Sequence, residues 1–163
     1  MLVSGYGQTL LQAWSSVQDR LGVGDSEPPS GTRTFADLAD ELDAVITALD
    51  LARPIVLVAH SLGAPVAMTW AAHHQQDVVL LDGSDGSFHE AVRAAADDAL
   101  AAGSANPDVL AVKGFLEGFE DPSTNLEGVD LRAAYAALDP LPRVGPVPVV
   151  VQVVRSLLAG AAG

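Results

Sequence analysis

The hydrophobic residues of the chain recur with two different periods, and these periods give the first evidence for its fold. At residues 35–49 apolar side chains return every three or four positions, which predicts a long amphipathic helix. Thr34 and Asp37 have the spacing of a capping box, a common helix start. Residues 10–21 show the same helical period. The sequence therefore predicts two amphipathic helices before its first strand.

Three short runs consist almost entirely of β-branched and other apolar residues, which is typical of strands buried on both faces of a sheet. They span residues 55–59, 78–81 and 147–154. An alanine-rich helical segment that begins just after Ser61 separates the first two runs. Helices that alternate with continuous apolar strands predict an α/β fold with a mostly parallel sheet flanked by helices.

Residues 84–143 lie between the second and third predicted strands and contain helical patterns without a convincing strand. In a parallel sheet, an insertion at this point lies near the carboxyl ends of the strands, where ligands bind. We therefore predict a helical, lid-like insertion at 84–143 within a single domain of residues 1–163.

The composition excludes several classes of partner. The formal net charge of −13 repels phosphate backbones and anionic membranes. The chain has no cysteine, which excludes disulfides, thiolate nucleophiles and sulfur-ligated metals. No basic segment followed by an apolar one opens the sequence, and its longest apolar run is too short to cross a bilayer. We expect a soluble, cytoplasmic protein without nucleic-acid or membrane partners.

The strand at 55–59 runs into Ser61 and then into a helix, the context of a nucleophile elbow. The sharp turn of an elbow requires small residues two before and two after the serine, here Ala59 and Gly63. It lifts the hydroxyl above the sheet and brings the amide of Leu62 within reach of an oxyanion. The simpler interpretation is that Ser61 only caps the following helix. The preceding strand and the small neighbours favour the elbow.

Four further segments accompany this elbow. Residues 4–7 read Ser-Gly-Tyr-Gly, and residues 19–26 read Asp-Arg-Leu-Gly-Val-Gly-Asp-Ser. Residues 81–84 end the second predicted strand, and residues 141–151 lead into the third. Together with the elbow, these segments resemble the serine α/β-hydrolases, a family of esterases and lipase-like enzymes. The family strand that normally precedes the segment at 19–26 is not visible, so we expect an incomplete sheet; loop glycines alone are the plainer interpretation of 19–26.

The resemblance implies a hydrolase of carboxylic esters in which Ser61 is the nucleophile. It assigns the oxyanion hole to the backbone amides of Tyr6 and Leu62 and implies no cofactor and no metal. A serine hydroxyl also needs a base, normally a histidine oriented by a carboxylate. The resemblance would put this histidine after residues 141–151, where the sequence has none.

His89 follows the second predicted strand, at the correct edge of the predicted sheet and at the start of the predicted insertion. Its simpler interpretation is a solvated residue in the first turn of a helix. The resemblance gives His60 a supporting role behind the elbow. His73 and His74 lie too far along the next helix to reach Ser61.

Asp82 and Asp85 are the candidates for the catalytic acid, because they follow the second predicted strand. Turn and capping roles are equally natural for both. The leading hypothesis is therefore a serine esterase with a small ester-like substrate. The alternative is a catalytically impaired or non-catalytic remnant that acts as a binding or assembly module, and a third reading is a cofactor-free peroxidase-like member of the fold. An incomplete sheet would expose strand edges, so we also predict a homo-oligomer.

Overall fold

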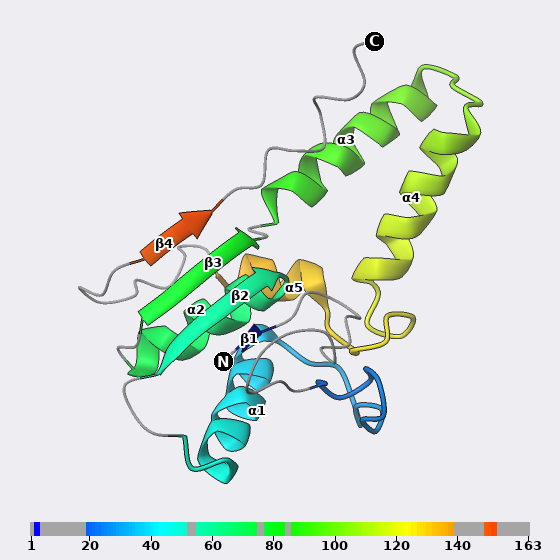
Figure 1. Cartoon of the computed structure of the whole chain (residues 1–163). Helices are drawn as coiled ribbons and strands as arrows, with labels where there is room; N and C mark the ends of the chain where they lie inside the picture. Colours follow the sequence, from blue (N-terminus) through cyan, green and yellow to red (C-terminus); the bar gives the residue numbers. More distant parts are fainter. Residues whose placement is uncertain are drawn as a thin grey trace.

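The computed structural model describes residues 2–3, 19–51, 55–74, 77–83, 86–138 and 149–152. Figure 1 shows a small sheet packed against helices, with a further pair of helices projecting from one end. From the helix predicted at 35–49 onward, the order of helices and strands is the one predicted from the sequence, whereas the strand at Leu2–Val3 is not among the predicted elements. In chain order the elements are β1 (Leu2–Val3), α1 (Phe35–Ala48), β2 (Val56–Ser61), α2 (Gly63–His74), β3 (Asp77–Gly83), α3 (Ser87–Ala101), α4 (Pro107–Glu120), α5 (Leu131–Ala136) and β4 (Val149–Gln152).

The strands of the described part form one parallel, four-stranded sheet in the order β1-β2-β3-β4. Strand β2 lies inside the sheet, where its Val58 and Ala59 pair with β1 and its other edge pairs with β3. Parallel neighbours need a crossover connection, and α1 and α2 lie in the connections on either side of β2. The carboxyl ends of the strands consequently meet at one edge of the sheet, where Ser61 ends β2.

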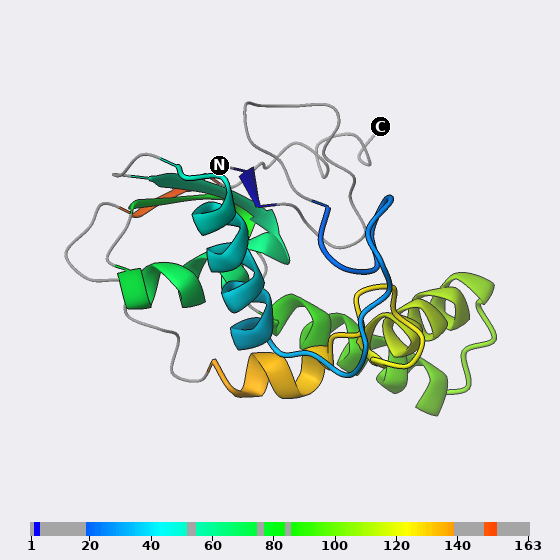
Figure 2. The same cartoon turned by 90° about the horizontal axis from the view of Figure 1, so that it is seen from below.

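Helices α1 and α2 form the layer that covers the sheet (Figure 2). Helix α1 begins at the predicted capping box, in which Thr34 and Asp37 bond reciprocally. Trp70 of α2 is 1% exposed, and its Nε1 donates to Oδ1 of Asp43 on α1 at 2.9 Å. Each large apolar side chain buried here stabilises the fold by about 1.5–3 kcal/mol. The buried apolar residues of α1 are Phe35, Leu38, Ala39, Leu42 and Ile46.

Strand β2 has one buried face and one open face. Leu57 and Ala59 are fully buried, whereas Val56 keeps 45% of its surface exposed. Val58 and His60 alternate with the buried pair and are partly exposed. The prediction that this strand is buried on both faces is wrong, because α1 and α2 cover the same face of the sheet (Figure 2).

The insertion predicted at 84–143 is helical in its described part and contains α3, α4 and α5. Helix α4 runs back beside α3 (Figure 1), and the ion pairs Arg93–Glu120 and Lys113–Asp97 join the two. The hydrogen bond that Lys113 donates to Asp97 raises the pKa of the Lys113 ammonium. Within residues 86–138 no strand forms, apart from an isolated bridge to Arg33. The role of this insertion as a lid stays a prediction.

The helix predicted at 10–21 lies mostly outside the described residues. Its described end, Asp19 to Leu21, is not helical, so the prediction is wrong there. The reason is a long-range contact that the helical period does not reveal: the Arg20 side chain is buried against Glu127. Turns follow at once, with φ of +86° at Gly22 and +58° at Gly24.

Candidate active site

Ser61 occupies a strained turn between a central strand and a helix. It is the last residue of β2, and α2 begins two residues later. Its φ is +49°, a left-handed conformation that costs a residue with a side chain about 1–2 kcal/mol. The pairing between β2 and β3 also shifts here, so that Ser61 lies opposite Gly83 while His60 lies opposite Leu81. This is the strand, sharp turn and helix expected of an elbow.

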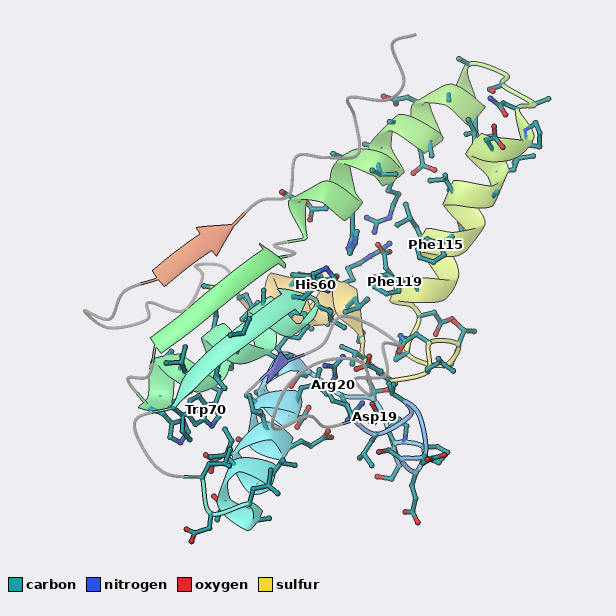
Figure 3. The ribbon with its side chains drawn as sticks, in the orientation of Figure 1. Asp19, Arg20, His60, Trp70, Phe115 and Phe119 are labelled. Atoms are coloured by element: carbon teal, nitrogen blue, oxygen red, sulfur yellow. The ribbon has the colours of Figure 1, made fainter. Side chains whose placement is uncertain are left out.

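The residues beside Ser61 are packed tightly. Ala59 and Leu62 have 0% and 1% of their surface exposed, and Gly63 is buried as well. A larger side chain in place of Ala59 or Gly63 would clash with the core beneath the turn. The first amides of α2 have no intrahelical acceptor, and the partial positive charge of the helix N-terminus lies beside them. Figure 3 shows His60 at the end of β2. The site thus offers a hydroxyl beside a donor-rich helix end.

A cavity of about 480 Å³ opens between the start of α3, the end of α4 and α5. Its wall begins at Gly86, three residues beyond the Gly83 that pairs with Ser61. Gly86 has a φ of +87° and lies against the ring of Tyr135, where a Cβ would approach Cγ to 2.8 Å. The lining residues are Gly86, Ser87, His89, Glu90, Arg93, Glu120, Leu131, Arg132, Tyr135, Ala136 and Leu138.

Charged side chains on this cavity were not singled out from the sequence. Glu120 accepts from Arg93 through Oε1 and from Arg132 through Oε2, the latter at 3.5 Å. Glu90 lies one helical turn before Arg93 on α3. The only sign of these residues in the sequence is that the helical segments predicted as a lid contain acidic and basic residues. Their convergence depends on how α3, α4 and α5 pack, which the helical period does not give.

His89 lies on the first turns of α3 and lines the cavity. Its ring makes edge contacts with Phe119 at 5.3 Å and with Tyr135 at 6.1 Å between ring centroids. The position at the start of a helix is the predicted one, but the ring is packed between aromatic rings rather than fully solvated. Its role as a base stays a prediction.

The remaining predicted site residues are only partly visible. Asp82 belongs to β3 and directly precedes Gly83, so its backbone lies at the same sheet edge as Ser61. Tyr6 and Asp85 fall outside the described residues. The assignment of an acid and of the second oxyanion donor therefore stays a prediction.

His73 and His74 end α2 and serve the packing of that helix. Nδ1 of His73 lies 2.8 Å from the carbonyl oxygen of Thr69, and Nδ1 of His74 lies 2.9 Å from that of Trp70. The His74 ring stacks on Trp70, and its Nε2 lies 3.2 Å from Oδ1 of Asp43. At about 1.5 Å of rise per residue, most of the length of α2 separates them from Ser61.

The segment at 19–26 folds into a compact loop against the insertion. Ser26 donates through its hydroxyl to the carbonyl oxygen of Asp19 at 2.7 Å, and the amide of Gly22 donates to the carbonyl oxygen of Glu27 at 2.8 Å. Figure 3 shows Asp19 and Arg20 close to the amino end of α1. Gly22 and Gly24 both have the positive φ that this tight loop requires.

Within the described ranges, no three histidine, aspartate or glutamate side chains gather in a way that could hold a metal ion. In the same ranges, no helix is both long and apolar enough to span a membrane. The predicted cytoplasmic location and homo-oligomer stay predictions.

Comparison with known families decides the larger class. The family model described as alpha/beta hydrolase fold matches residues 17–102, which is more than half of the chain. This match runs from the loop at 19–26 through the Ser61 elbow to α3. The chain belongs to the α/β-hydrolase fold family. At the level of this fold family, the resemblance inferred from the sequence is confirmed.

Individual relatives of this α/β-hydrolase cover smaller segments. Haloalkane dehalogenases from two strains of Sphingobium indicum are 42% and 41% identical over 64 residues, which are 37% of this chain and 22% of each relative. The uncharacterized protein YqjL of Bacillus subtilis is 36% identical over 67 residues, 39% of this chain and 26% of the relative. The chain thus matches about a quarter of the length of these curated relatives. No solved structure matches it significantly.

Proposed function

We propose that this chain is a serine hydrolase that acts on carboxylic esters, with Ser61 as the nucleophile. The observation that carries the proposal is the φ of +49° at Ser61, between an inner strand of the parallel sheet and the first turn of α2. A strained, non-glycine residue at the carboxyl edge of a sheet is typical of a functional position. A serine that merely capped the helix would take extended backbone angles instead.

In the proposed reaction, the Ser61 oxygen attacks the ester carbonyl and forms a tetrahedral intermediate. The amide of Leu62, at the start of α2, stabilises the negative charge on the former carbonyl oxygen, and the amide of Tyr6 is the proposed second donor. Collapse of this intermediate expels the alcohol and leaves an acyl group on Ser61. Water then cleaves the acyl ester and regenerates the hydroxyl.

Proton removal from Ser61 is the step with the least support. His89 is the proposed base, with Asp82 or Asp85 as its acid, because Asp82 lies near the end of β3 at the Ser61 edge of the sheet and the other two follow it closely in the sequence. The contacts of His89 with Phe119 and Tyr135 fit a packing role equally well. This packing role is the observation behind the second candidate function, a catalytically impaired or non-catalytic remnant that acts as a binding or assembly module.

The names of two relatives raise a different chemistry, the hydrolysis of haloalkanes. A serine oxygen that displaced a halide would become an alkyl ether, which water does not cleave. An acyl group on the same oxygen is an ester and can be hydrolysed. The serine at position 61 therefore favours carboxylic esters over haloalkanes as substrates for this chain.

Labelling with a fluorophosphonate tests whether Ser61 is activated, without knowledge of the substrate. We expect the chain to be labelled and Ser61→Ala to lose all labelling. Loss of one member of a triad can leave roughly 10³–10⁴-fold catalysis over water, so the hydrolysis rate of an activated ester must be measured as well. A slow, Ser61-dependent rate that His89→Ala leaves unchanged would indicate the impaired remnant. An unlabelled chain whose ester hydrolysis is unaffected by Ser61→Ala would refute the serine mechanism.

A further inference from the structure

Two arginines and one glutamate meet on the cavity between α3, α4 and α5. The side chain of Glu120 is 9% exposed, and its two oxygens accept from Arg93 and from Arg132. Two guanidinium groups therefore share one carboxylate. This cluster carries one positive charge in excess, in a chain whose formal net charge is −13.

Arg132 is the residue of this cluster whose guanidinium is best placed to donate to a bound molecule. Its side chain is 72% exposed, and its contact with Glu120, at 3.5 Å, is at the outer limit of a hydrogen bond. A guanidinium presents five N–H donors in a planar fork that fits a carboxylate. Because each oxygen of Glu120 already accepts from an arginine, the cluster favours an added anion over an added cation.

The rest of the wall suits a short carbon chain. Leu131 and Leu138 are buried, and Tyr135 contributes an aromatic face. The volume of about 480 Å³ lies within the range of about 300–1,000 Å³ that is common for small-molecule sites.

The cavity also lies near the elbow. Gly86 lines it, and three residues back along the chain Gly83 is the strand partner of Ser61. Three extended residues and one spacing between strands together reach at most about 15 Å. This upper bound places the wall of the cavity at Gly86 in the neighbourhood of Ser61.

We propose that this cavity binds the free carboxylate of a small organic acid, with Arg132 as its partner. As an extension that rests on the proposed function, the preferred substrate is a monoester of a dicarboxylic acid, whose ester carbonyl is at Ser61. Arg132 is then a specificity-determining residue that selects negatively charged esters over neutral ones.

A carboxylate fits this lining better than a phosphate. Glu90 and Glu120 contribute two carboxylates to the same wall, and each repels a doubly charged anion more strongly than a singly charged one. Inorganic phosphate is therefore the matched competitor in the test.

The test is a calorimetric titration of the Ser61→Ala chain, in which turnover cannot consume the probe. The probes are monomethyl adipate, its neutral counterpart dimethyl adipate, and inorganic phosphate. We expect monomethyl adipate to bind at least about tenfold more tightly than either of the others. Arg132→Ala on the same background should remove this preference, and Arg132→Lys should restore part of it.

Lys113→Ala is the matched control, because Lys113 is a paired cation on α4, in the same insertion as Arg132, and does not line the cavity. It should leave the binding of monomethyl adipate unchanged, and thermal melting should show that each variant is folded. Three results would each overturn the proposal. The neutral diester would bind as tightly as monomethyl adipate, Arg132→Ala would bind monomethyl adipate as tightly as its parent, or phosphate would bind more tightly than monomethyl adipate.

The outcome is independent of the proposed function. If fluorophosphonate labelling of Ser61 fails but the titration succeeds, the esterase proposal fails and the carboxylate site stands. If labelling succeeds but the titration fails, the esterase stands without this selectivity. Where both succeed, Arg132→Ala should raise the KM for the monoester and leave kcat nearly unchanged.

Discussion

Arg20 and Glu127, which lie 107 positions apart in the chain, form a buried two-pronged ion pair. Nε of Arg20 lies 2.7 Å from Oε2 of Glu127, and the second guanidinium nitrogen lies 2.8 Å from Oε1. Their side chains are 5% and 0% exposed. Arg33 donates to the carbonyl oxygen of Glu127 at 2.8 Å. These contacts therefore join three segments at one point: the loop at 19–26, the start of α1 and the chain after α4.

Removal of one partner should be costly because it leaves the other charge buried. We expect Arg20→Ala or Glu127→Ala to reduce the free energy of unfolding by about 3–5 kcal/mol, measured by urea unfolding. The double variant Arg20→Met with Glu127→Leu should recover most of this loss, since no uncompensated charge remains. Lys113→Ala, which breaks a solvent-exposed pair, should reduce the free energy of unfolding far less than either buried single variant. Equal effects of the buried and exposed single variants would contradict this account.

Alanine variants of Gly22 and Gly103 distinguish two costs: the strain of a positive φ and the cost of a close contact. The φ values of these two glycines are +86° and +85°, but a Cβ at Gly22 would lie 1.8 Å from the carbonyl oxygen of Leu126, whereas Gly103 faces open space. We expect Gly103→Ala to destabilise by about 1–2 kcal/mol through its φ alone. Gly22→Ala should cost about 1–3 kcal/mol more, because backbone must move.

The same urea series should include Gly31→Ala as a reference. Gly31 has open space and no positive φ, so alanine should leave stability unchanged or raise it by about 0.4–1 kcal/mol. If Gly22→Ala and Gly103→Ala were equally destabilising, the contact between Gly22 and Leu126 would not matter for stability.

Asp37 should make the start of α1 sensitive to pH. The hydrogen bond from the Thr34 hydroxyl, followed by that from the Thr34 amide, lowers the pKa of Asp37 below its ordinary value of 3.8. Because the pKa of Asp37 is lower in the folded chain than in the unfolded chain, the stabilisation is complete when the pH is above the unfolded pKa. It is lost as the pH falls through the folded pKa. Asp37→Asn should therefore be less stable than the original chain at pH 7, and this gap should narrow below pH 3.8. Urea unfolding at both pH values measures it, and a gap that widened in acid would contradict the assignment.

The sequence predicted the elements whose signal is local. The capping box at Thr34, the strand that ends at Ser61 and the small residues around it are all patterns of a few consecutive positions. It did not predict the Arg20–Glu127 pair or the meeting of Arg93, Arg132 and Glu120, because these contacts join segments far apart in the chain. It also overestimated the burial of β2, since an apolar run shows that a strand is hydrophobic but not how many of its faces are covered.

Ser61 offers the last prediction, in which a stability measurement tests the elbow independently of catalysis. Glycine in regular structure is ordinarily less stable than alanine by about 0.5–1 kcal/mol, because it loses more freedom on folding. At a φ of +49° the order should reverse, since only a residue with a Cβ pays the left-handed strain.

We therefore expect Ser61→Gly to be more stable than Ser61→Ala by about 1 kcal/mol in urea unfolding. Both variants lack the hydroxyl, so the difference between them reports the backbone and not the loss of a nucleophile. Ala72→Gly, in the last turns of α2, is the control and should be destabilising by about 1 kcal/mol. If Ser61→Gly were the less stable of the two, Ser61 would have ordinary backbone angles in solution, and the strained turn that supports its role as a nucleophile would be lost.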